Sequence, residues 1–465
     1  MKRPNILILY TDQQRWDALA ANGNPAIITP NLNQLAAQGL NYDRFFVQNP
    51  VCMPSRYSFL TGQYCSTLRV FENGTPVPEN VIALPHLLRN YGYTSANIGK
   101  LHFLPHANRD HRTIHPHYGF DHLEISDEPG CYEDAYRAWV RRQAPEHLDD
   151  ISLGLPPAAE MWESITRRGD HVVHPEERFP KKALAFRGPD ALTHSAFVAE
   201  QTINFIREHR DRPFCCIGGF YSPHSPWVAP RRFLDMYDPA NLPVARLPDD
   251  VAAAAAHNNR FSEDERRGAT HGYYAMVTEV DHHVGKILKC LENEGLAENT
   301  IVLFTSDHGE FLGDFLHYGK GFPAPDCISR VPLIVRWPEG LRDTGQTLHH
   351  ITEAVDVLPS LLNWAGIPVP RHVQGKRLPE NSEAPPAREA ALTEMLGARS
   401  LRTQHHRYIV RANGSESLHD LTTPYGEYRN VADDPAYAEQ LNRHRTLLIR
   451  RMLDIEQPVP RTVQY

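Results

Sequence analysis

The sequence predicts a layered α/β fold with a small α+β domain after it. Three short apolar runs, each ending abruptly in polar residues, lie at residues 6–10, 214–224 and 301–310. This pattern is typical of buried strands that carry polar groups at their carboxyl ends. Helical patterns separate the runs, and such alternation favours sheet and helices in layers. The carboxyl ends of strands in open α/β sheets form the ligand crevice, so we expect the polar segments to meet there.

The elements of the large domain follow in order after the first strand. Helices are expected at residues 29–39, 193–210, 263–294 and 356–366. Residues 130–189 are rich in Pro, Arg, His and Asp with weak periodicity, which predicts loops and short helices over the crevice. Such insertions usually decide specificity. The alanine run at 252–256 is most simply a helical segment.

A second, smaller domain is predicted at the end of the chain. The 465 residues exceed the length at which a single core usually stops growing, so one large domain with a smaller partner is expected. A Pro-rich, polar stretch reaching residue 386 puts the boundary near residue 370, which gives domains 1–370 and 371–465. The small domain has candidate strands at 390–395, 400–411 and 417–421 and a helix at 435–455.

Composition and charge narrow the classes of function. The chain is 41% hydrophobic and 22% charged, so it can bury a substantial core, and its net charge of -8 argues against general affinity for nucleic acid. The first apolar run is too short for a signal peptide, and no run approaches a membrane span, so a cytoplasmic location is expected. Seven scattered cysteines fit a reducing environment. A small-molecule substrate is expected, and a homo-oligomer stays open.

The sharpest local signal is Cys52-Met53-Pro54-Ser55-Arg56. Pro54 suits the first turn of a helix, so Cys52 would lie just before free backbone N–H groups that favour an anion. The guanidinium of Arg56 adds positive charge. A buried structural Cys is one alternative. A Cys-dependent phosphatase is another, but it would need five residues between its Cys and Arg, and here there are three.

The spacing Cys-x-Pro-Ser-Arg resembles instead the signature of the sulfatase family, in which the Cys is oxidised after translation to formylglycine (3-oxoalanine). Further elements similar to that family follow in order along nearly the whole chain. They are Asp12-Gln13, Lys100 and His102 in GKLHF, His224 in SPHSP, Asp307-His308-Gly309-Glu310, Gly313-Asp314 and Gly319-Lys320. Each alone has a structural alternative, such as a helix cap, a solvated charge or a His bonded to a core carbonyl. Their joint order supports the resemblance.

The resemblance implies an alkaline phosphatase-like fold, with a large mixed central sheet flanked by helices. It implies a divalent metal, Ca²⁺ before Mn²⁺, and a formylglycine-generating enzyme as a partner in maturation. The implied metal ligands are Asp12, Cys52, Asp307 and His308. The implied catalytic residues are Cys52, Arg56, Lys100, His102, His224 and Lys320. The implied substrate contacts are Gln13 and Asn73, the latter in RVFENGT.

The family mechanism assigns each group a step. One hydroxyl of hydrated formylglycine at position 52, deprotonated with help from Asp307, would attack sulfur. His224 or Lys320 would protonate the departing alcohol or phenol while nearby cations stabilise the sulfuryl oxygens. Removal of a proton from the second hydroxyl by His102 would then expel sulfate.

Two departures from the commonest sulfatase pattern refine the resemblance. Many sulfatases carry Asp-Asp at the first metal segment and Asp-Asn at the second, whereas this chain has Asp12-Gln13 and Asp307-His308. This pairing is similar to the branch that contains choline sulfatases and phosphonate monoester hydrolases. A His ligand makes manganese more plausible than an all-oxygen site would.

The class of substrate follows from a third motif. The pair of Lys100 and His102 points toward sulfate monoesters, because phosphonate monoester hydrolases as a group lack it. A phosphonate monoester or phosphodiester hydrolase is the alternative function, and a binding protein that has lost its chemistry is a second one, against which the intact motifs argue. The alcohol half of the substrate stays open. His111, His115 and His117 are either solvated loop residues or substrate contacts.

Overall fold

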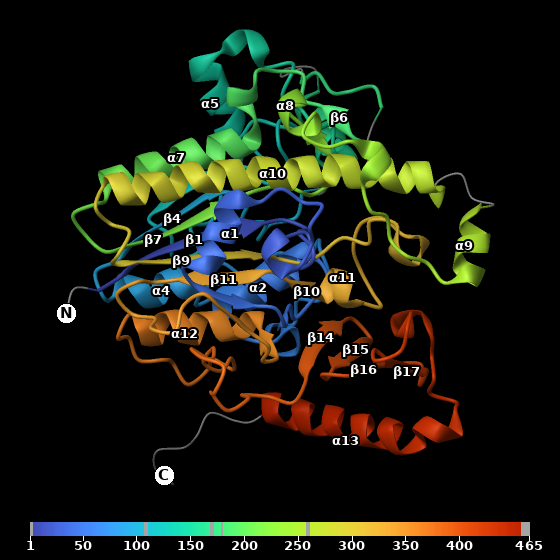
Figure 1. Ribbon diagram of the computed structural model, residues 1–465. Helices are drawn as coiled ribbons and strands as arrows, with labels where there is room; N and C mark the ends of the chain where they lie inside the picture. Colours follow the sequence, from blue (N-terminus) through green and yellow to red (C-terminus); the bar gives the residue numbers. More distant parts are fainter. Residues whose placement is uncertain (1–2, 107–109, 168–171, 178–179, 257–260, 457–465) are drawn as a thin grey trace.

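The computed structural model describes residues 3–106, 110–167, 172–177, 180–256 and 261–456, and an eight-stranded sheet forms its centre (Figure 1). In spatial order the strands are β12 (Gln346–Leu348), β2 (Leu40–Tyr42), β11 (Leu333–Arg336), β9 (Thr300–Ser306), β1 (Asn5–Thr11), β7 (Phe214–Gly219), β4 (Thr94–Gly99) and β5 (His122–Ile125). The strands from β9 to β5 are parallel, whereas β11 is antiparallel to both of its neighbours. The predicted mixed sheet is confirmed.

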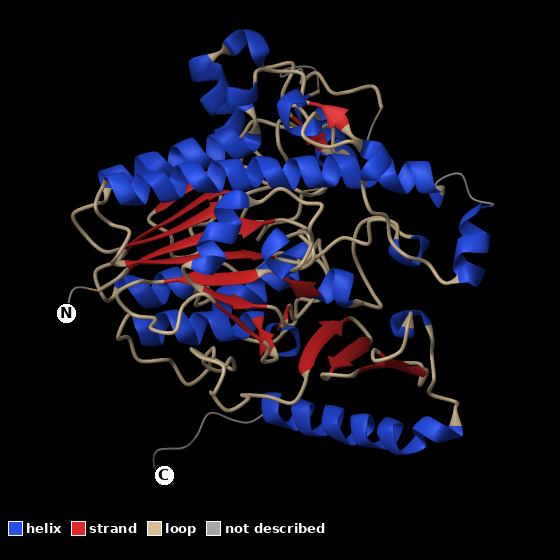
Figure 2. Ribbon diagram, viewed as in Figure 1, coloured by secondary structure: helices blue, strands red, loops and turns tan. Residues whose placement is uncertain are grey.

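Helices cover both faces of the sheet (Figure 2). One face carries α1 (Pro30–Ala37), α5 (Ala135–Gln143), α7 (His194–Glu208) and α10 (Glu263–Asn293). The other carries α2 (Cys52–Thr61), α4 (Leu84–Arg89) and α12 (Val357–Trp364). Leu7 and Leu9 of β1 pack into the first layer, and Ile6 and Ile8 pack into the second. Since successive strand residues point to opposite faces, a wholly apolar strand is what a sheet covered on both sides requires.

The end of the chain forms a smaller sheet-and-helix unit. Four antiparallel strands lie in the order β14 (Ala391–Met395), β15 (Ala398–Arg402), β16 (His406–Arg411) and β17 (Glu416–Asp420). The helix α13 (Ala438–Ile455) packs its apolar residues into the same core. The prediction of one strand over residues 400–411 was wrong, because residues 403–405 form the connection between β15 and β16. The domain boundary near residue 370 stays a prediction.

Apart from three-residue 3₁₀ helices, the remaining elements are α-helices and mostly very short strands. They are α3 (Cys65–Leu68), α6 (Pro156–Thr166), α8 (Arg231–Leu234), α9 (Asp249–Ala256), α11 (Asp326–Ser329), β3 (Phe45–Phe46), β6 (Leu184–Ala185), β8 (Val228–Ala229), β10 (Arg330–Val331) and β13 (Thr352–Glu353). The predicted short helices within residues 130–189 are α5 and α6, and residues 168–171 and 178–179 lie outside the described ranges. Across the described ranges, no helix combines the length and apolarity that crossing a membrane requires.

Candidate active site

Four neighbouring parallel strands bring polar residues to one edge of the sheet. Asp12 follows β1, Lys100 follows β4, and Asp307 and His308 follow β9. His224 lies in the loop after β7. Because β9, β1, β7 and β4 are consecutive in the sheet, their carboxyl ends lie side by side. The expected meeting of these segments at the sheet edge is therefore confirmed.

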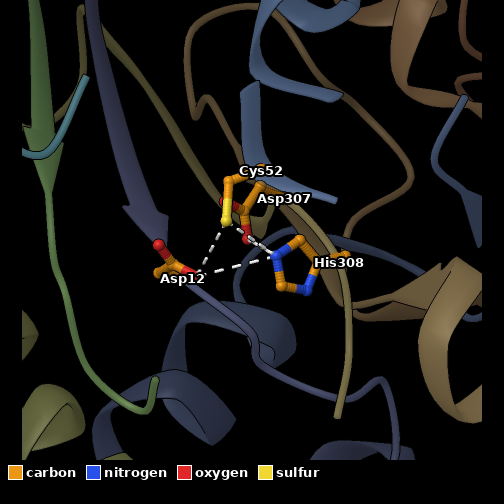
Figure 3. Close-up of side chains that lie close together, drawn as sticks. All are labelled: Asp12, Cys52, Asp307 and His308. Atoms are coloured by element: carbon orange, nitrogen blue, oxygen red, sulfur yellow. Dashed lines mark hydrogen bonds and ion pairs between the residues drawn. The ribbon is translucent and has the colours of Figure 1, made fainter. Parts of the chain in front are cut away.

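Cys52 completes this group from the N-terminus of α2. It is the first residue of that helix, and Pro54 lies in the first turn, as predicted. Its Sγ lies 3.1 Å from His308 Nε2 and 3.8 Å from Asp12 Oδ1 (Figure 3). Asp307 joins the same group, with its Oδ1 3.6 Å from His308 Nε2. The four potential ligand atoms lie within 4.8 Å of one another, and all four residues are buried. The predicted ligand set therefore forms a candidate metal centre.

Three cations surround the candidate metal centre. Lys320 Nζ lies 2.6 Å from Cys52 Sγ, and Lys100 Nζ lies 2.7 Å from Asp12 Oδ2. The Nε of Arg56 donates to Asp307 Oδ2 at 2.7 Å. Arg56 and Lys100 are almost completely buried, so their charges act in a medium that screens them far less than water does. This arrangement suits a ligand with several anionic oxygens.

Burial also sets the protonation of the candidate ligands. Burial and the nearby Asp12 carboxylate raise the pKa of the Cys52 thiol to about 11. Burial lowers the pKa of His308 to about 4, so its imidazole is neutral and available as a metal ligand. Burial alone would raise the pKa of Asp12, but Lys100 and the other cations hold it well below its usual range. The unmodified thiol is therefore protonated at neutral pH, beside an ionised carboxylate.

His224 and Lys320 form a pair beside position 52. The Nζ of Lys320 lies 3.1 Å from His224 Nε2, and His224 Nδ1 lies 2.6 Å from the carbonyl oxygen of Ser225. A proton on Nδ1 that donates to this carbonyl leaves Nε2 as the acceptor for the Lys320 ammonium group. Burial and Lys320 hold the pKa of His224 well below its usual value. Burial alone would lower the pKa of Lys320, but Cys52 and Asp12 raise it. Lys320 is therefore the member of the pair that carries the proton.

Comparison with known proteins identifies the family to which this site belongs. The sequence pattern of the sulfatase family matches residues 4–367. The chain belongs to the sulfatase family. An arylsulfatase of Clostridium perfringens is 30% identical, over 97% of this chain and 94% of its own length. A choline-sulfatase of Rhizobium meliloti is 27% identical, over 93% of this chain and 83% of its own. The solved structure of a phosphonate monoester hydrolase of Agrobacterium radiobacter has a TM-score of 0.82 at 25% identity, and the match covers 97% and 96% of the two chains.

These matches confirm the resemblance drawn from the motifs. The chain has the alkaline phosphatase-like fold, and it is a sulfuric ester hydrolase. The choline-sulfatase and phosphonate monoester hydrolase relatives agree with the predicted branch of the family.

The sulfatase holds Lys100 and His102 in a tight turn after β4. At Gly219, the last residue of β7, a Cβ would lie within 2.2 Å of the Lys100 carbonyl oxygen, so the close approach of these two segments requires a glycine. His102 adopts a left-handed φ of 54°. Burial and neighbouring His106 hold the pKa of His102 well below its usual value, so its ring is neutral.

The two predicted substrate contacts lie in different settings. Gln13 is buried with a left-handed φ of 70°, and its N–H donates to Asp307 Oδ1 at 3.0 Å while its side-chain N–H₂ donates to Glu310. Asn73 is exposed, and its Oδ1 accepts the N–H of Met53 at 3.0 Å in the first turn of α2. Gln13 therefore lies beside the candidate metal ligands, whereas Asn73 lies next to Cys52 along the start of the helix. Contact of either with substrate stays a prediction.

Sequence reasoning missed two acidic residues beside the site. Asp127 and Glu128 follow β5, the strand next to β4, and the Glu128 carboxylate lies 3.5 Å from Lys100 Nζ. His111 stacks on Tyr132, with ring centroids 3.7 Å apart.

Proposed function

We propose that the chain hydrolyses an organic sulfate monoester to an alcohol or phenol and sulfate, using formylglycine made from Cys52 and a divalent metal. The observation that carries this proposal is the position of Cys52, which starts α2 inside the buried group of Asp12, Asp307 and His308. Family membership supports the same chemistry. A formylglycine-generating enzyme would make the modification before the chain can act.

The donor set fits a divalent cation. Asp12, Asp307, His308 and residue 52 would hold it, because their potential ligand atoms lie within 4.8 Å of one another and the imidazole is neutral. The carboxylate oxygens suit calcium, and the imidazole makes manganese the second choice. The bound cation would supply positive charge to a sulfuryl oxygen.

The protonation state of Cys52 argues against the unmodified thiol as the nucleophile. A thiol with a pKa raised to about 11 by burial and Asp12 is a poor nucleophile at neutral pH, because the thiolate is the reactive form. A hydrated aldehyde at the same position would supply an oxygen nucleophile and a second hydroxyl for release of sulfate.

The cationic side chains have distinct roles in the proposed reaction. Lys100 and Arg56 would hold sulfuryl oxygens, and such fixed charges are each worth about 10²- to 10³-fold in rate. Lys320 is the proton donor to the departing oxygen, because it carries its proton at neutral pH and its Nζ lies 2.6 Å from Cys52 Sγ and 3.1 Å from His224 Nε2. His102 is the proton acceptor during release of sulfate, because its ring is neutral and its buried Nδ1 has no hydrogen-bond partner in the described chain.

A phosphonate monoester or phosphodiester hydrolase is the second candidate function. The likeness to the phosphonate monoester hydrolase of Agrobacterium radiobacter favours it. The Lys100 and His102 pair argues for the sulfate ester, because phosphonate monoester hydrolases as a group lack this pair.

Comparison of two substrates in one preparation tests the proposed function. The protein is produced together with a formylglycine-generating enzyme and assayed with an aryl sulfate and with phenyl phosphonate. We expect a higher kcat/KM for the sulfate. A higher kcat/KM for the phosphonate would establish the second candidate instead.

Two further parts of the proposal concern the setting of the enzyme. All seven cysteines are buried, and none forms a disulfide in the described chain, which supports a reducing compartment such as the cytoplasm. The chain is also proposed to act on small molecules rather than on nucleic acid, because its net charge is -8. Whether copies associate is a question for a solution mass measurement.

A further inference from the structure

An acidic pair outside the proposed machinery lies beneath the Lys100–His102 turn. Asp127 and Glu128 follow β5 at the same edge of the sheet as the proposed catalytic residues. Both are buried, with 0% and 7% of their surfaces exposed. Buried carboxylates are costly unless they are paired with cations or N–H donors. Their contacts therefore indicate what they hold in place.

Asp127 fixes the backbone of the turn. Its Oδ1 accepts the N–H of Leu101 at 2.9 Å and the N–H of His102 at 2.8 Å. His102 has a φ of 54°, a left-handed conformation that residues with a side chain rarely adopt. Such a conformation persists only where its surroundings over-determine it. The Asp127 carboxylate supplies two of the bonds that do so.

Glu128 restrains the two side chains of the same turn. Its Oε1 lies 3.5 Å from Lys100 Nζ and 3.2 Å from His106 Nε2. Lys100 Nζ also pairs with the Asp12 carboxylate. The ring of His106 stacks on His102, with centroids 4.1 Å apart and planes 30° apart. Glu128 thus contacts Lys100 directly and reaches His102 through His106.

We propose that Asp127 and Glu128 are positioning residues for sulfate ester hydrolysis, with Asp127 fixing the backbone and Glu128 the side chains of the Lys100–His102 turn. This inference rests on the proposed function, in which Lys100 holds a sulfuryl oxygen and His102 accepts a proton. Neither carboxylate needs to touch the substrate. A misplacement of about 1 Å at a reacting group costs about 10²-fold in rate, so such bracing has a measurable effect.

Two nearby, more exposed carboxylates with bonds of the same kind outside the turn provide controls. Asp121 lies before β5, and its Oδ2 accepts the N–H of Ser95 in β4 at 2.9 Å. Glu124 in β5 lies 2.9 Å from His122, just as Glu128 pairs with His106. A purely structural role for carboxylates around β4 and β5 would make these controls behave like the acidic pair.

Steady-state kinetics on 4-nitrophenyl sulfate compare Asp127→Ala with Asp121→Ala, and Glu128→Ala with Glu124→Ala. We expect Asp127→Ala to lower kcat about 10²-fold with little change in KM, and Glu128→Ala to lower it about 10-fold, while both controls stay near wild type. Asp127→Asn and Glu128→Gln keep an acceptor oxygen and should recover part of the loss. Losses no greater than those of the controls would overturn the proposal.

Amide hydrogen exchange tests the same inference without turnover. We expect faster exchange in a peptide that spans Leu101 and His102 in Asp127→Ala, and a smaller increase in Asp127→Asn, which serves if the alanine variant does not fold. Asp121→Ala should leave this peptide unchanged. Unchanged exchange in both Asp127 variants would overturn the positioning role. If the wild-type enzyme releases no sulfate from any ester, the proposed function fails, and the exchange result still decides whether Asp127 fixes the turn.

Discussion

Position 52 shows at the residue scale how environment decides chemistry. The thiol has three cations nearby, yet burial and Asp12 raise its pKa to about 11. We expect Cys52→Ser to bind an aryl sulfate while its kcat falls about 10⁶-fold, as it does when the nucleophile of a serine protease is removed. Binding is measured by competition and turnover by sulfate release. Cys65→Ser changes another buried cysteine, which lies outside the candidate metal centre, and this control should keep its activity. Full turnover by Cys52→Ser would exclude a formylglycine mechanism.

Arg56 tests the electrostatic part of the site at the same scale. Its guanidinium bonds Asp307 at 2.7 Å and is 1% exposed, so Arg56→Ala leaves a buried carboxylate without its partner. We expect a loss of about 3 kcal/mol in the free energy of unfolding, measured with urea, together with a fall of about 10²-fold in kcat. Arg89→Ala removes an exposed arginine paired with Asp121 and should cost less than about 1 kcal/mol. Equal costs for the two would contradict the account.

A buried ion-pair network joins the C-terminal elements to the large sheet-and-helix unit. Glu353, which ends β13, bonds Arg388 before β14 and Arg451 of α13. It also accepts the hydroxyl of Tyr64, at 2.5 Å, beside α3. Because Glu353, Arg388 and Arg451 are all buried, this network links their elements structurally. Tyr64 extends the network to the segment that follows α2.

Acid titration tests that link at the element scale. Burial alone would raise the pKa of Glu353, but Arg388 and Arg451 lower it in the folded protein. Its contribution to stability is therefore present above the unfolded Glu pKa of about 4.3 and is lost as pH falls through the lower folded value. We expect Glu353→Gln to cost about 3 kcal/mol of unfolding free energy at pH 7, with the difference from wild type shrinking below about pH 4.

The control for this titration lies in the same part of the chain. Glu389 pairs with Arg443 at the surface, where about half of each side chain is exposed. Glu389→Gln should cost less than about 1 kcal/mol at every pH. A cost for Glu353→Gln that stays constant down to about pH 2 would contradict the assigned role of its charge.

At the scale of the whole molecule, the metal should stabilise the fold. An ion that binds the folded chain alone at a hundred times its Kd adds about 2.7 kcal/mol to the free energy of unfolding. We expect the Tm to fall after chelation and to recover with Ca²⁺ or Mn²⁺, whichever supports turnover. Asp307→Asn removes the charge of one proposed ligand, so the Tm of this variant should change little when either ion is added. A Tm insensitive to chelation and to both ions would argue against the metal centre.

The sequence predicted the central sheet well, because its buried strands share one pattern of an apolar run followed by polar residues. The runs at β1, β7 and β9 are wholly apolar because both faces of the sheet are covered, and their polar ends revealed Asp12, Asp307 and the segment of His224. The prediction failed where alternation is weak or connections are short. Residues 400–411 resemble one continuous strand in the sequence because the connection between β15 and β16 is only three residues long. The strand pattern of β5 is weak because this strand is partly exposed along its length.

The sequence predicted which residues belong to the site, but it did not predict which of them contact each other. Motif order identified the residues around Cys52, but no spacing reveals that Lys320 pairs with His224 or that Asp127 holds the His102 N–H. Those contacts join segments far apart in the chain and depend on how the loops fold over the sheet edge. Asn73 was predicted as a substrate contact, and its Oδ1 accepts a hydrogen bond from the first turn of α2.

The most direct test of the account is the mass of the tryptic peptide that carries Cys52, taken after production with a formylglycine-generating enzyme and compared with the sulfatase activity of the same sample. We predict a peptide about 18 Da lighter than the unmodified one, since sulfur and two hydrogens are exchanged for oxygen. Activity should rise in proportion to the converted fraction. An unmodified thiol in a fully active sample would contradict the account.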